Sequence, residues 1–395
     1  MRSLVLFFVF SSLAEGGQAV VLLWLTYALT SNALLIGVVV VLGYLPAALV
    51  GLLFSRVADR GRADRMARST NSVLSVTSFL LAAQQFTSGR SVALSMTVIS
   101  LSQVVLSIAK MTNKAALNRL IRNLFDRDTA RRLMGLTSSS SLIGQVVGAG
   151  LAGLFLAQRW VVGGLLFAAV AYGLSALFMT LGTRGYTEPG ERAEEESGQP
   201  EGQTPMRWSF GLVAVLLFSI PSSGGLQFMT TLLVPLADAV APNQPSFYAV
   251  LNIVSIGGGF LAGVLLSTSV VSSRQVLAWA LPIAGALALL LAFFHLKYLV
   301  VLECFALVLV ITCHVICMQV MTNQAPRDHE IGQFAVMRNV VASLAKAVFS
   351  FAAGALVGLC GISGTSAVLA AALACFALAW PALRSRWRVP GIDVP

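Results

Sequence analysis

The chain has 395 residues, of which 57% are hydrophobic and only 11% are charged, and its formal net charge is +10. A soluble domain has roughly 25% charged residues, so this composition excludes a protein whose whole surface faces water. Apolar runs of about 20 residues, enough for a helix to cross a bilayer, recur along the chain, whereas a membrane barrel would show shorter alternating segments. The sequence therefore predicts an all-α membrane protein.

Taken in chain order, the apolar runs predict twelve transmembrane helices. They cover residues 4–29, 33–54, 69–88, 91–112, 133–157, 161–183, 208–236, 245–270, 275–296, 298–320, 333–360 and 364–383. The first run is longer than the apolar region of a signal peptide and lacks a cleavage site of the A-x-A type. We therefore expect it to stay in the protein as the first span.

Basic residues collect in the loops on one side of the predicted membrane. Arg-rich segments at 55–68 and 114–132 lie on this side, while the opposite side has only Arg90, Arg159 and Lys297. Because Lys and Arg in short loops favour the cytoplasm, we expect both termini there, in a multi-pass protein of the cell membrane (the cytoplasmic or inner membrane of a bacterium). The positive charge then faces anionic lipid, and the chain has no basic folded domain for binding nucleic acid.

One long polar stretch, at residues 184–208, is rich in Glu, Gly and Pro and is typical of a linker. Two sequence echoes flank it at an offset of about 210 residues: MTNKA, from Met111, returns as MTNQA, and VGLLFS, from Val50, returns as AGVLLS. The pattern predicts two six-helix pseudo-repeats with a site between them at mid-membrane. The predicted units are an N-terminal bundle over 1–183, a cytoplasmic linker over 184–207 and a C-terminal bundle over 208–395.

The segment WLTYALTSNALLIGVVVVLGYLPAALVGLLFSRVADRGRADRMAR, which begins at Trp24, resembles the start of major facilitator superfamily transporters. The likeness is to the branch that contains macrolide and enterobactin exporters. In the loop after helix 2 the family shows G-x-L-a-D-r and a basic cluster; here Ser55 replaces the Gly, whereas Asp59, Arg60 and Arg65 match. The resemblance covers the whole twelve-helix plan and implies the major facilitator fold, with these three residues latching the cytoplasmic gate. The second-half copy, LLSTSVVSSR, has no acid, so the latch is one-sided.

The predicted fifth helix contains GQVVGAGLAG, which begins at Gly144 and includes Gly148 and Gly153. It resembles the family motif G-x-x-x-G-P-x-x-G-G, which is associated with antiporters, although Ala149 and Ala152 replace the Pro and one Gly. Alternatively, the glycines allow close packing of helices. The same letters match the dinucleotide pattern G-x-G-x-x-G, but that fingerprint needs a preceding strand in a soluble unit, which an apolar span excludes.

Neither a catalytic nor a metal-binding constellation is evident. Ser363, in GISG, needs a base, but His329 precedes it in a loop on the opposite side of the predicted membrane. Cys313 and Cys317 share a helix face without a further ligand, so we expect buried thiols. The sequence thus predicts neither an enzyme nor a bound cofactor or metal, and it shows no nucleotide-binding motif for direct use of ATP.

A few ionisable residues fall inside the predicted spans, where each costs about 2.5–3.5 kcal/mol at a helix centre and is a functional candidate. Glu15 and Lys346 lie deepest and come from opposite halves. Alternatives are a static hydrogen bond for Glu15 and a fixed ion pair for Lys346. We predict that Glu15 couples protons. The predicted substrate-binding residues are Glu15, Gln18, Gln145, His314, Arg338 and Lys346.

Other polar residues in the spans have simpler interpretations. Arg338 and His314, in the cytoplasmic parts of helices 11 and 10, suit structural or gating roles as well as ligand binding. Glu303, near the external end of helix 10, is expected to be solvated or interfacial. Lys110 is expected to extend to the cytoplasmic interface, as long basic side chains do.

A carboxylate in a partly dry cavity is disfavoured as the anion, so Glu15 can exchange a proton. The sequence therefore predicts a proton-coupled secondary transporter of a small organic molecule, and the family resemblance implies export. The excess of cations over acids favours an anionic or zwitterionic substrate, such as a siderophore-like polycarboxylate. The alternatives are a broad drug/proton antiporter linked to drug resistance, an importer of the same anionic class, and a receptor or assembly factor that transports nothing. We expect a monomer.

Overall fold

The computed structural model describes residues 2–53, 63–87, 91–124, 143–183, 210–242, 244–268, 272–324 and 331–384, and the regular structure in these ranges is entirely helical. The helices of the first half are α1 (Arg2–Thr30), α2 (Ala33–Leu53), α4 (Ala63–Thr87), α5 (Val92–Leu124), the helix Ile143–Ala157 and α7 (Val161–Gly182). Those of the second half are α9 (Phe210–Val240), α10 (Pro245–Ser267), α11 (Ser273–Phe293), α12 (Lys297–Gln324) and α13 (Ile331–Arg384).

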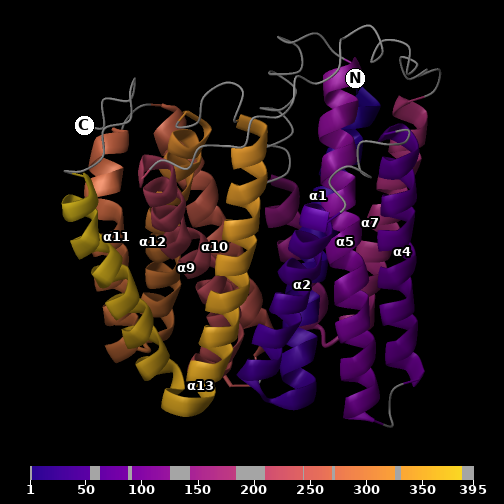
Figure 1. The fold of residues 1–395 in the computed structure, drawn as a ribbon. Coiled ribbons are helices and arrows are strands. Elements are labelled where there is room, and N and C mark those ends of the chain that lie inside the picture. The colour runs from indigo at the N-terminus through magenta and orange to yellow at the C-terminus, as the bar shows by residue number, and fades with distance from the viewer. Residues whose placement is uncertain are drawn as a thin grey trace, which may run out of the picture.

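The helices stand side by side in two groups, with α1 to α7 on one side and α9 to α13 on the other (Figure 1). α1 begins and α13 ends at the same end of the molecule, the upper end in Figure 1, which we call the terminus end. The opposite end is the far end. α13 reverses direction at Gly361, whose φ of 68° suits a residue without a side chain. This break divides α13 into a first arm before Gly361 and a second arm after it.

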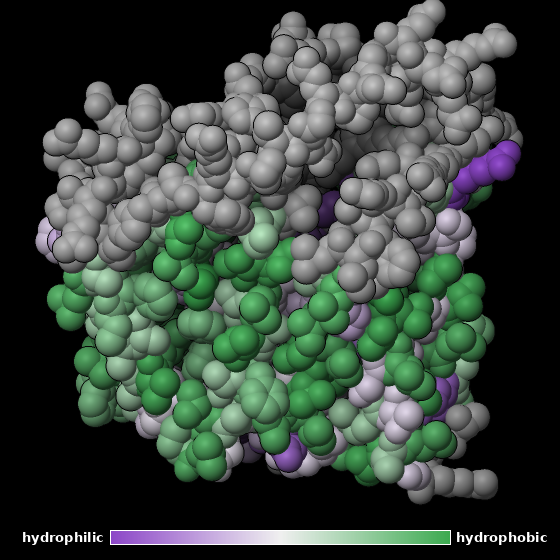
Figure 2. Space-filling view, in the orientation of Figure 1, coloured by the Kyte–Doolittle hydropathy of each residue, from purple (hydrophilic) through white to green (hydrophobic). Residues whose placement is uncertain are grey.

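Eight of the described helices are long and apolar enough to cross a membrane, and two shorter apolar helices lie at Ala33–Leu49 and Ile143–Ala157. Hydrophobic side chains cover the middle of the face shown in Figure 2. Large apolar residues such as Phe79, Leu101 and Leu378 are exposed on the outside. Because soluble proteins rarely expose apolar surface on this scale, the chain is a multi-pass membrane protein.

Most of the predicted spans end close to the ends of the described helices. Two differ: α4 begins at Ala63, before its predicted start at residue 69, and α5 runs to Leu124, well beyond its predicted end at residue 112. The predicted start of the fifth span, at 133–142, lies outside the described residues. The extension, NKAALNRLIRNL, alternates charged or polar residues with apolar ones, which lowers its mean hydropathy, and hydropathy marks only the apolar part of a helix. Lys110 therefore lies in the body of α5 rather than near its end.

A buried polar network joins α1, α4, α5 and α7. Asn71 Nδ2 donates to Asn113 Oδ1 at 2.9 Å, and the Ser175 and Ser11 hydroxyls donate to Asn71 Oδ1 at 3.3 and 3.5 Å. Asn113 belongs to the MTNKA echo. Since Ser11 lies one turn before Glu15 and Asn113 about one turn from Lys110, the network sets α1 and α5 at a fixed register.

The 143–157 helix packs backbone to backbone against α1. A Cβ added at Gly148 would overlap the carbonyl oxygen of Leu13, and a Cβ added at Gly144 would lie 2.9 Å from the Ser12 Cβ. At Gly153 a Cβ would overlap Ala249 of α10, in the other half. These contacts agree with the interpretation that the glycines of the motif allow close packing of helices.

Candidate functional site

The two halves meet closely at the far end along α2 and the first arm of α13. A Cβ added at Gly354 would lie 2.5 Å from the carbonyl oxygen of Ala33, and one at Gly37 would lie 2.8 Å from that of Ser350. Ordinary van der Waals contacts of a Cβ begin at about 3.4 Å. The two helices therefore touch through their backbones, which only glycine allows at these positions.

Two further contacts join α1 to the second half at the far end. The ring of Trp24 stacks on that of Tyr248, with centroids 5.8 Å apart and an interplanar angle of 20°. Tyr27 Oη donates to Asp238 Oδ2 at 3.3 Å. Because α1 ends at Thr30, both contacts lie in its last two turns. The contacts along α2 and α13 and around the end of α1 hold the two halves together at the far end in this conformation.

Glu15 of α1 and Lys110 of α5 approach each other at mid-height. Lys110 Nζ lies 3.8 Å from Glu15 Oε1, within ion-pair range but too long for a hydrogen bond. The Glu15 side chain is 45% exposed and that of Lys110 is 29% exposed. Ala19, one turn along α1, is exposed as well. Neither charged side chain is packed into the hydrophobic core, although both lie far from the helix ends.

Tyr44, on α2, connects this pair to the second half. Tyr44 Oη donates to Gln227 Oε1 of α9 at 2.9 Å, and Lys346 Nζ of α13 lies 5.1 Å from the centroid of the Tyr44 ring. Glu15 is near enough to Tyr44 and Lys346 for electrostatic interaction with both. Glu15, Tyr44, Lys110, Gln227 and Lys346 thus form one group, which we call the central cluster.

The central cluster draws on both halves and on five helices. The cluster holds one carboxylate, Glu15, and two ammonium groups from different halves: Lys110 pairs with Glu15, and Lys346 lies over the ring of Tyr44. Tyr44 and Gln227 add a hydroxyl and an amide able to hydrogen-bond a ligand. A lysine over a tyrosine ring gains about 0.5–2 kcal/mol, depending on its exposure to water. The arrangement suits a polar ligand that carries negative charge.

Gln18 is hydrogen-bonded to α4 and α7 and not to a residue of the central cluster. It is fully buried, its Nε2 donates to Ser78 Oγ at 2.7 Å, and Tyr172 Oη donates to Gln18 Oε1 at 3.3 Å. Three residues along a helix turn the side chain about 60° away from that of Glu15, which points Gln18 toward α4 and α7. The prediction that Gln18 contacts substrate does not fit this conformation.

His314 and Arg338 are also placed away from the central cluster. His314 is only 1% exposed and lies inside the second half. Arg338 Nη1 donates to Thr322 Oγ1 of α12 at 3.3 Å, near the terminus end. This bond ties α13 to α12, which fits the structural alternative for Arg338. Neither residue has the access to a central ligand that the sequence prediction assumes.

Gln145, by contrast, lies beside the cluster. Its side chain is partly exposed, and its backbone is packed against Gly16, the neighbour of Glu15. Of the predicted gate residues, Arg65 is exposed on α4, whereas Asp59 and Arg60 lie outside the described residues. The sequence prediction missed Lys110, Tyr44 and Gln227 as site residues.

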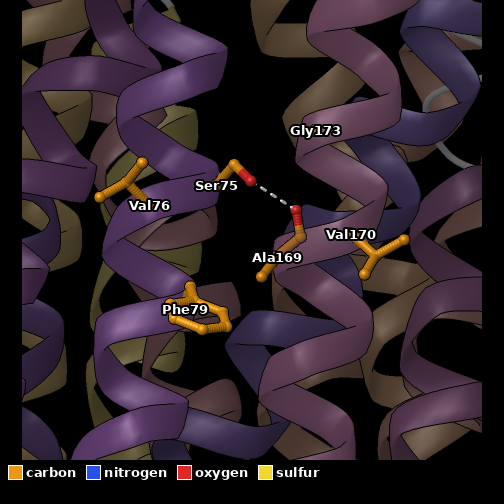
Figure 3. Close-up of a pocket in the computed structure, with 6 residues that line it drawn as sticks. All are labelled: Ser75, Val76, Phe79, Ala169, Val170 and Gly173. Atoms are coloured by element: carbon orange, nitrogen blue, oxygen red, sulfur yellow. Dashed lines mark hydrogen bonds between the residues drawn. The ribbon is translucent and has the colours of Figure 1, made fainter.

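A separate groove lies on the outer face between α4 and α7. It is lined by Ser75, Val76, Phe79, Ala169, Val170 and Gly173. The Ser75 hydroxyl donates to the Ala169 carbonyl at 2.7 Å, which leaves the remaining lining almost wholly apolar (Figure 3). With no charged lining residue, the groove offers nothing to orient a charged ligand. Among the described residues, no group of three His, Cys, Asp or Glu side chains converges to hold a metal ion.

The sequence profile of the Major Facilitator Superfamily matches residues 4–350. The chain belongs to this superfamily. A search of curated proteins found no match. The fold is similar to that of a bacterial homologue of the human lysosomal transporter Spinster in an inward-facing, occupied conformation, with a TM-score of 0.73 and 13% identity over 98% of this chain and 96% of that one.

Two other solved structures are similar. A point mutant of the nucleoside transporter NupG gives a TM-score of 0.72 at 15% identity, covering 97% of this chain and 99% of that chain. A POT family transporter in complex with 5-aminolevulinic acid gives 0.74 at 11% identity, covering 98% and 96%. At such low identity these likenesses establish the fold alone. Together with the superfamily match they identify a membrane transporter of a small molecule and not an enzyme.

Proposed function

We propose that the protein is a proton-coupled secondary transporter that moves an anionic or zwitterionic organic molecule by alternating access. The observation that carries this proposal is the central cluster, where Glu15 pairs with Lys110 of its own half and Lys346 of the other half lies over the ring of Tyr44. A ligand that bridges Lys110 and Lys346 would connect the two halves directly. Such a bridge is what alternating access between rigid halves requires of a substrate site.

The topology that we infer has twelve spans. To reach twelve, each arm of α13 is counted as one span, and α2, α4 and the 143–157 helix are added to the long apolar helices. The six-helix units are 1–183 and 208–395, joined by a linker at 184–207. The positive-inside rule places the terminus end, with both termini, in the cytoplasm of a cell. The far end then faces the exterior, and the protein works as a monomer.

We infer that Glu15 carries the coupled proton. The Glu15–Lys110 pair is partly exposed, so its contribution to stability is about 0–1 kcal/mol and a ligand can displace it easily. An anionic group that binds Lys110 deprives Glu15 of its nearest cation, and the carboxylate then favours proton uptake. Substrate binding and protonation are linked through competition for one lysine. Lys110, rather than Lys346, is the first partner of Glu15 in this mechanism.

Export remains our proposal for the direction of transport, because of the resemblance of residues 24–68 to macrolide and enterobactin exporters. A siderophore-like polycarboxylate suits the two lysines. A broad drug/proton antiporter is the second candidate, since Glu15 could face a cationic drug once Lys110 turns away. An importer of the same anionic class would use an identical site and differ only in the gradient that drives it.

Binding measurements on the purified transporter distinguish these substrates. A panel of mono-, di- and tricarboxylates and cationic drugs is titrated against wild type, Lys110→Ala and Lys346→Ala. Each lost charged hydrogen bond is worth about 1.5–3 kcal/mol, so carboxylate affinity should fall roughly 10- to 150-fold in both variants. Lys114→Ala is the matched control, because Lys114 lies one turn further along α5 and is exposed. Tight binding of cationic drugs, with carboxylates ignored, would replace the proposal by the antiporter.

A further inference from the structure

Glu303, on α12, is buried inside the second half. The residue is only 3% exposed, and neither carboxylate oxygen has a hydrogen-bond partner among the residues that the structure describes. A solvated or interfacial position was expected from its closeness to the helix end. Glu303 is buried instead, because it lies on the side of α12 where Val300, Cys304 and Leu307 belong to the main hydrophobic core.

No cation is available to pair with Glu303 on the described parts of the helices packed around it. α12 packs against α9, α10 and α11, and at fewer points against α13. From Phe210 to Leu236, α9 has no Asp, Glu, Lys, Arg or His, and α11 has none from Gln275 to Phe293. The titratable group of α10 is Tyr248, and α9 adds Asp238 only at its far end.

The remaining candidates on the neighbouring segments are also remote or engaged. Lys297, at the start of α12, donates to Gln244 Oε1 at 3.4 Å and lies 5.2 Å from the centroid of the Phe247 ring. His314 shares the face of Glu303 but is three turns further along α12. On α13, the first arm carries Arg338, which donates to Thr322, and Lys346, which lies over the Tyr44 ring, while the second arm carries only Cys375 before it ends at Arg384. His295, in the loop before α12, is exposed. Of these groups, none brings a positive charge to the buried carboxylate.

A buried carboxylate with neither a counter-ion nor a hydrogen-bond donor is strongly disfavoured as an anion. The neutral acid avoids that penalty. We propose that Glu303 is a second proton-binding site of the transporter and holds a proton in this conformation. This inference goes beyond the proposed function, which assigns coupling to Glu15, and the two can fail independently.

The position of Glu303 indicates where its proton is exchanged. Six residues separate it from Lys297, which corresponds to about 9 Å along α12, whereas about 32 Å separate it from Gln324 at the other end. Tyr298 and Leu302, on the same part of α12, are well exposed. The short route therefore leads to the far end. Opening of the contacts at that end would bring water to Glu303 and let the proton leave on that side.

Infrared spectroscopy of the purified transporter at neutral pH tests the proposal without any substrate. Wild type should show the carbonyl stretch of a protonated carboxylic acid, and Glu303→Gln should lose it. Glu15→Gln is the control, since Glu15 is paired with Lys110, and it should keep the band. A wild-type spectrum without the band, or a band that survives in Glu303→Gln, would overturn the proposal.

A second test measures thermal stability, because the buried amide of Glu303→Gln can itself disturb folding. Met has a similar volume and needs no hydrogen bonds, so Glu303→Met should keep or raise the thermal unfolding midpoint if the acid is neutral and unpaired. Asp64→Leu is the contrasting variant, because the buried Asp64 carboxylate is bound to Arg68, and its loss should lower the midpoint. A midpoint lowered as much by Glu303→Met would show a charged, paired Glu303 and contradict the proposal.

Discussion

The contact between α2 and α13 makes the far-end closure sensitive to a single methyl group. Gly354→Ala places a Cβ 2.5 Å from the Ala33 carbonyl oxygen and 2.9 Å from the Leu34 Cα, both on α2. Since ordinary contacts begin at 3.4 Å, the two helices must separate by about 1 Å to accept it. Overpacking of this kind costs typically about 1–3 kcal/mol.

This strain exists only while the far end is closed, so it should favour the state with the far end open. A difference of about 1–3 kcal/mol changes the ratio of two states roughly 5- to 150-fold. Gly358→Ala is the matched control, because it lies one turn further along the same arm and a Cβ there meets nothing within 4 Å. The two variants share any gain in helix propensity.

Spin-label distance measurements report the populations directly. Labels at Val92 and Leu296, exposed near the far ends of the two halves, are introduced after the exposed Cys360 and Cys375 are replaced by Ser. Gly354→Ala should move the distance distribution toward longer values, and Gly358→Ala should leave it as in wild type. The reasoning fails if both variants match wild type, or if both shift equally.

Two further changes test the assignments around the cluster. Tyr44→Phe removes the hydrogen bond to Gln227 but keeps the ring beneath Lys346, so the same labels should show the closed state weakened by about 0.5–1.5 kcal/mol, and an unchanged distribution would contradict this. Gln18→Leu should lower thermal stability by about 1–3 kcal/mol, because it leaves buried hydroxyls unpaired, while carboxylate affinity stays within two-fold; a large affinity loss would return Gln18 to the site.

The fold is readable from the sequence because hydropathy and length constrain a membrane helix strongly. The ends of α2, α7 and α10 agree closely with their predicted spans. The end of α5 does not, because the charged residues in its last turns lower the mean hydropathy there. Because the predicted span ended too early, the sequence analysis placed Lys110 at the interface, whereas in the structure it lies beside Glu15.

The site was harder to predict, since it depends on which side of a helix faces which neighbour. Glu15 and Lys346 stand out as charges in apolar segments, and both belong to the cluster. Tyr44 is an uncharged residue in an apolar span and gives no such signal. Gln18 and Glu303 were assigned from their positions along their helices, but the packing of α4, α7 and the second-half core determines what surrounds them.

The central claim is that Glu15 couples substrate movement to protons. Proteoliposomes that contain the carboxylate bound most tightly in the panel, together with a pH-sensitive dye, measure both fluxes at once under an imposed pH gradient. Wild type should accumulate the carboxylate against its gradient with matching proton movement.

Glu15→Gln, whose amide mimics the protonated acid, is the decisive variant. It should bind the carboxylate within a few-fold of wild type and still exchange it across the membrane, but show neither uphill transport nor substrate-dependent proton flux. Uphill transport that persists in Glu15→Gln, or a wild type that moves substrate with no proton flux, would contradict the account.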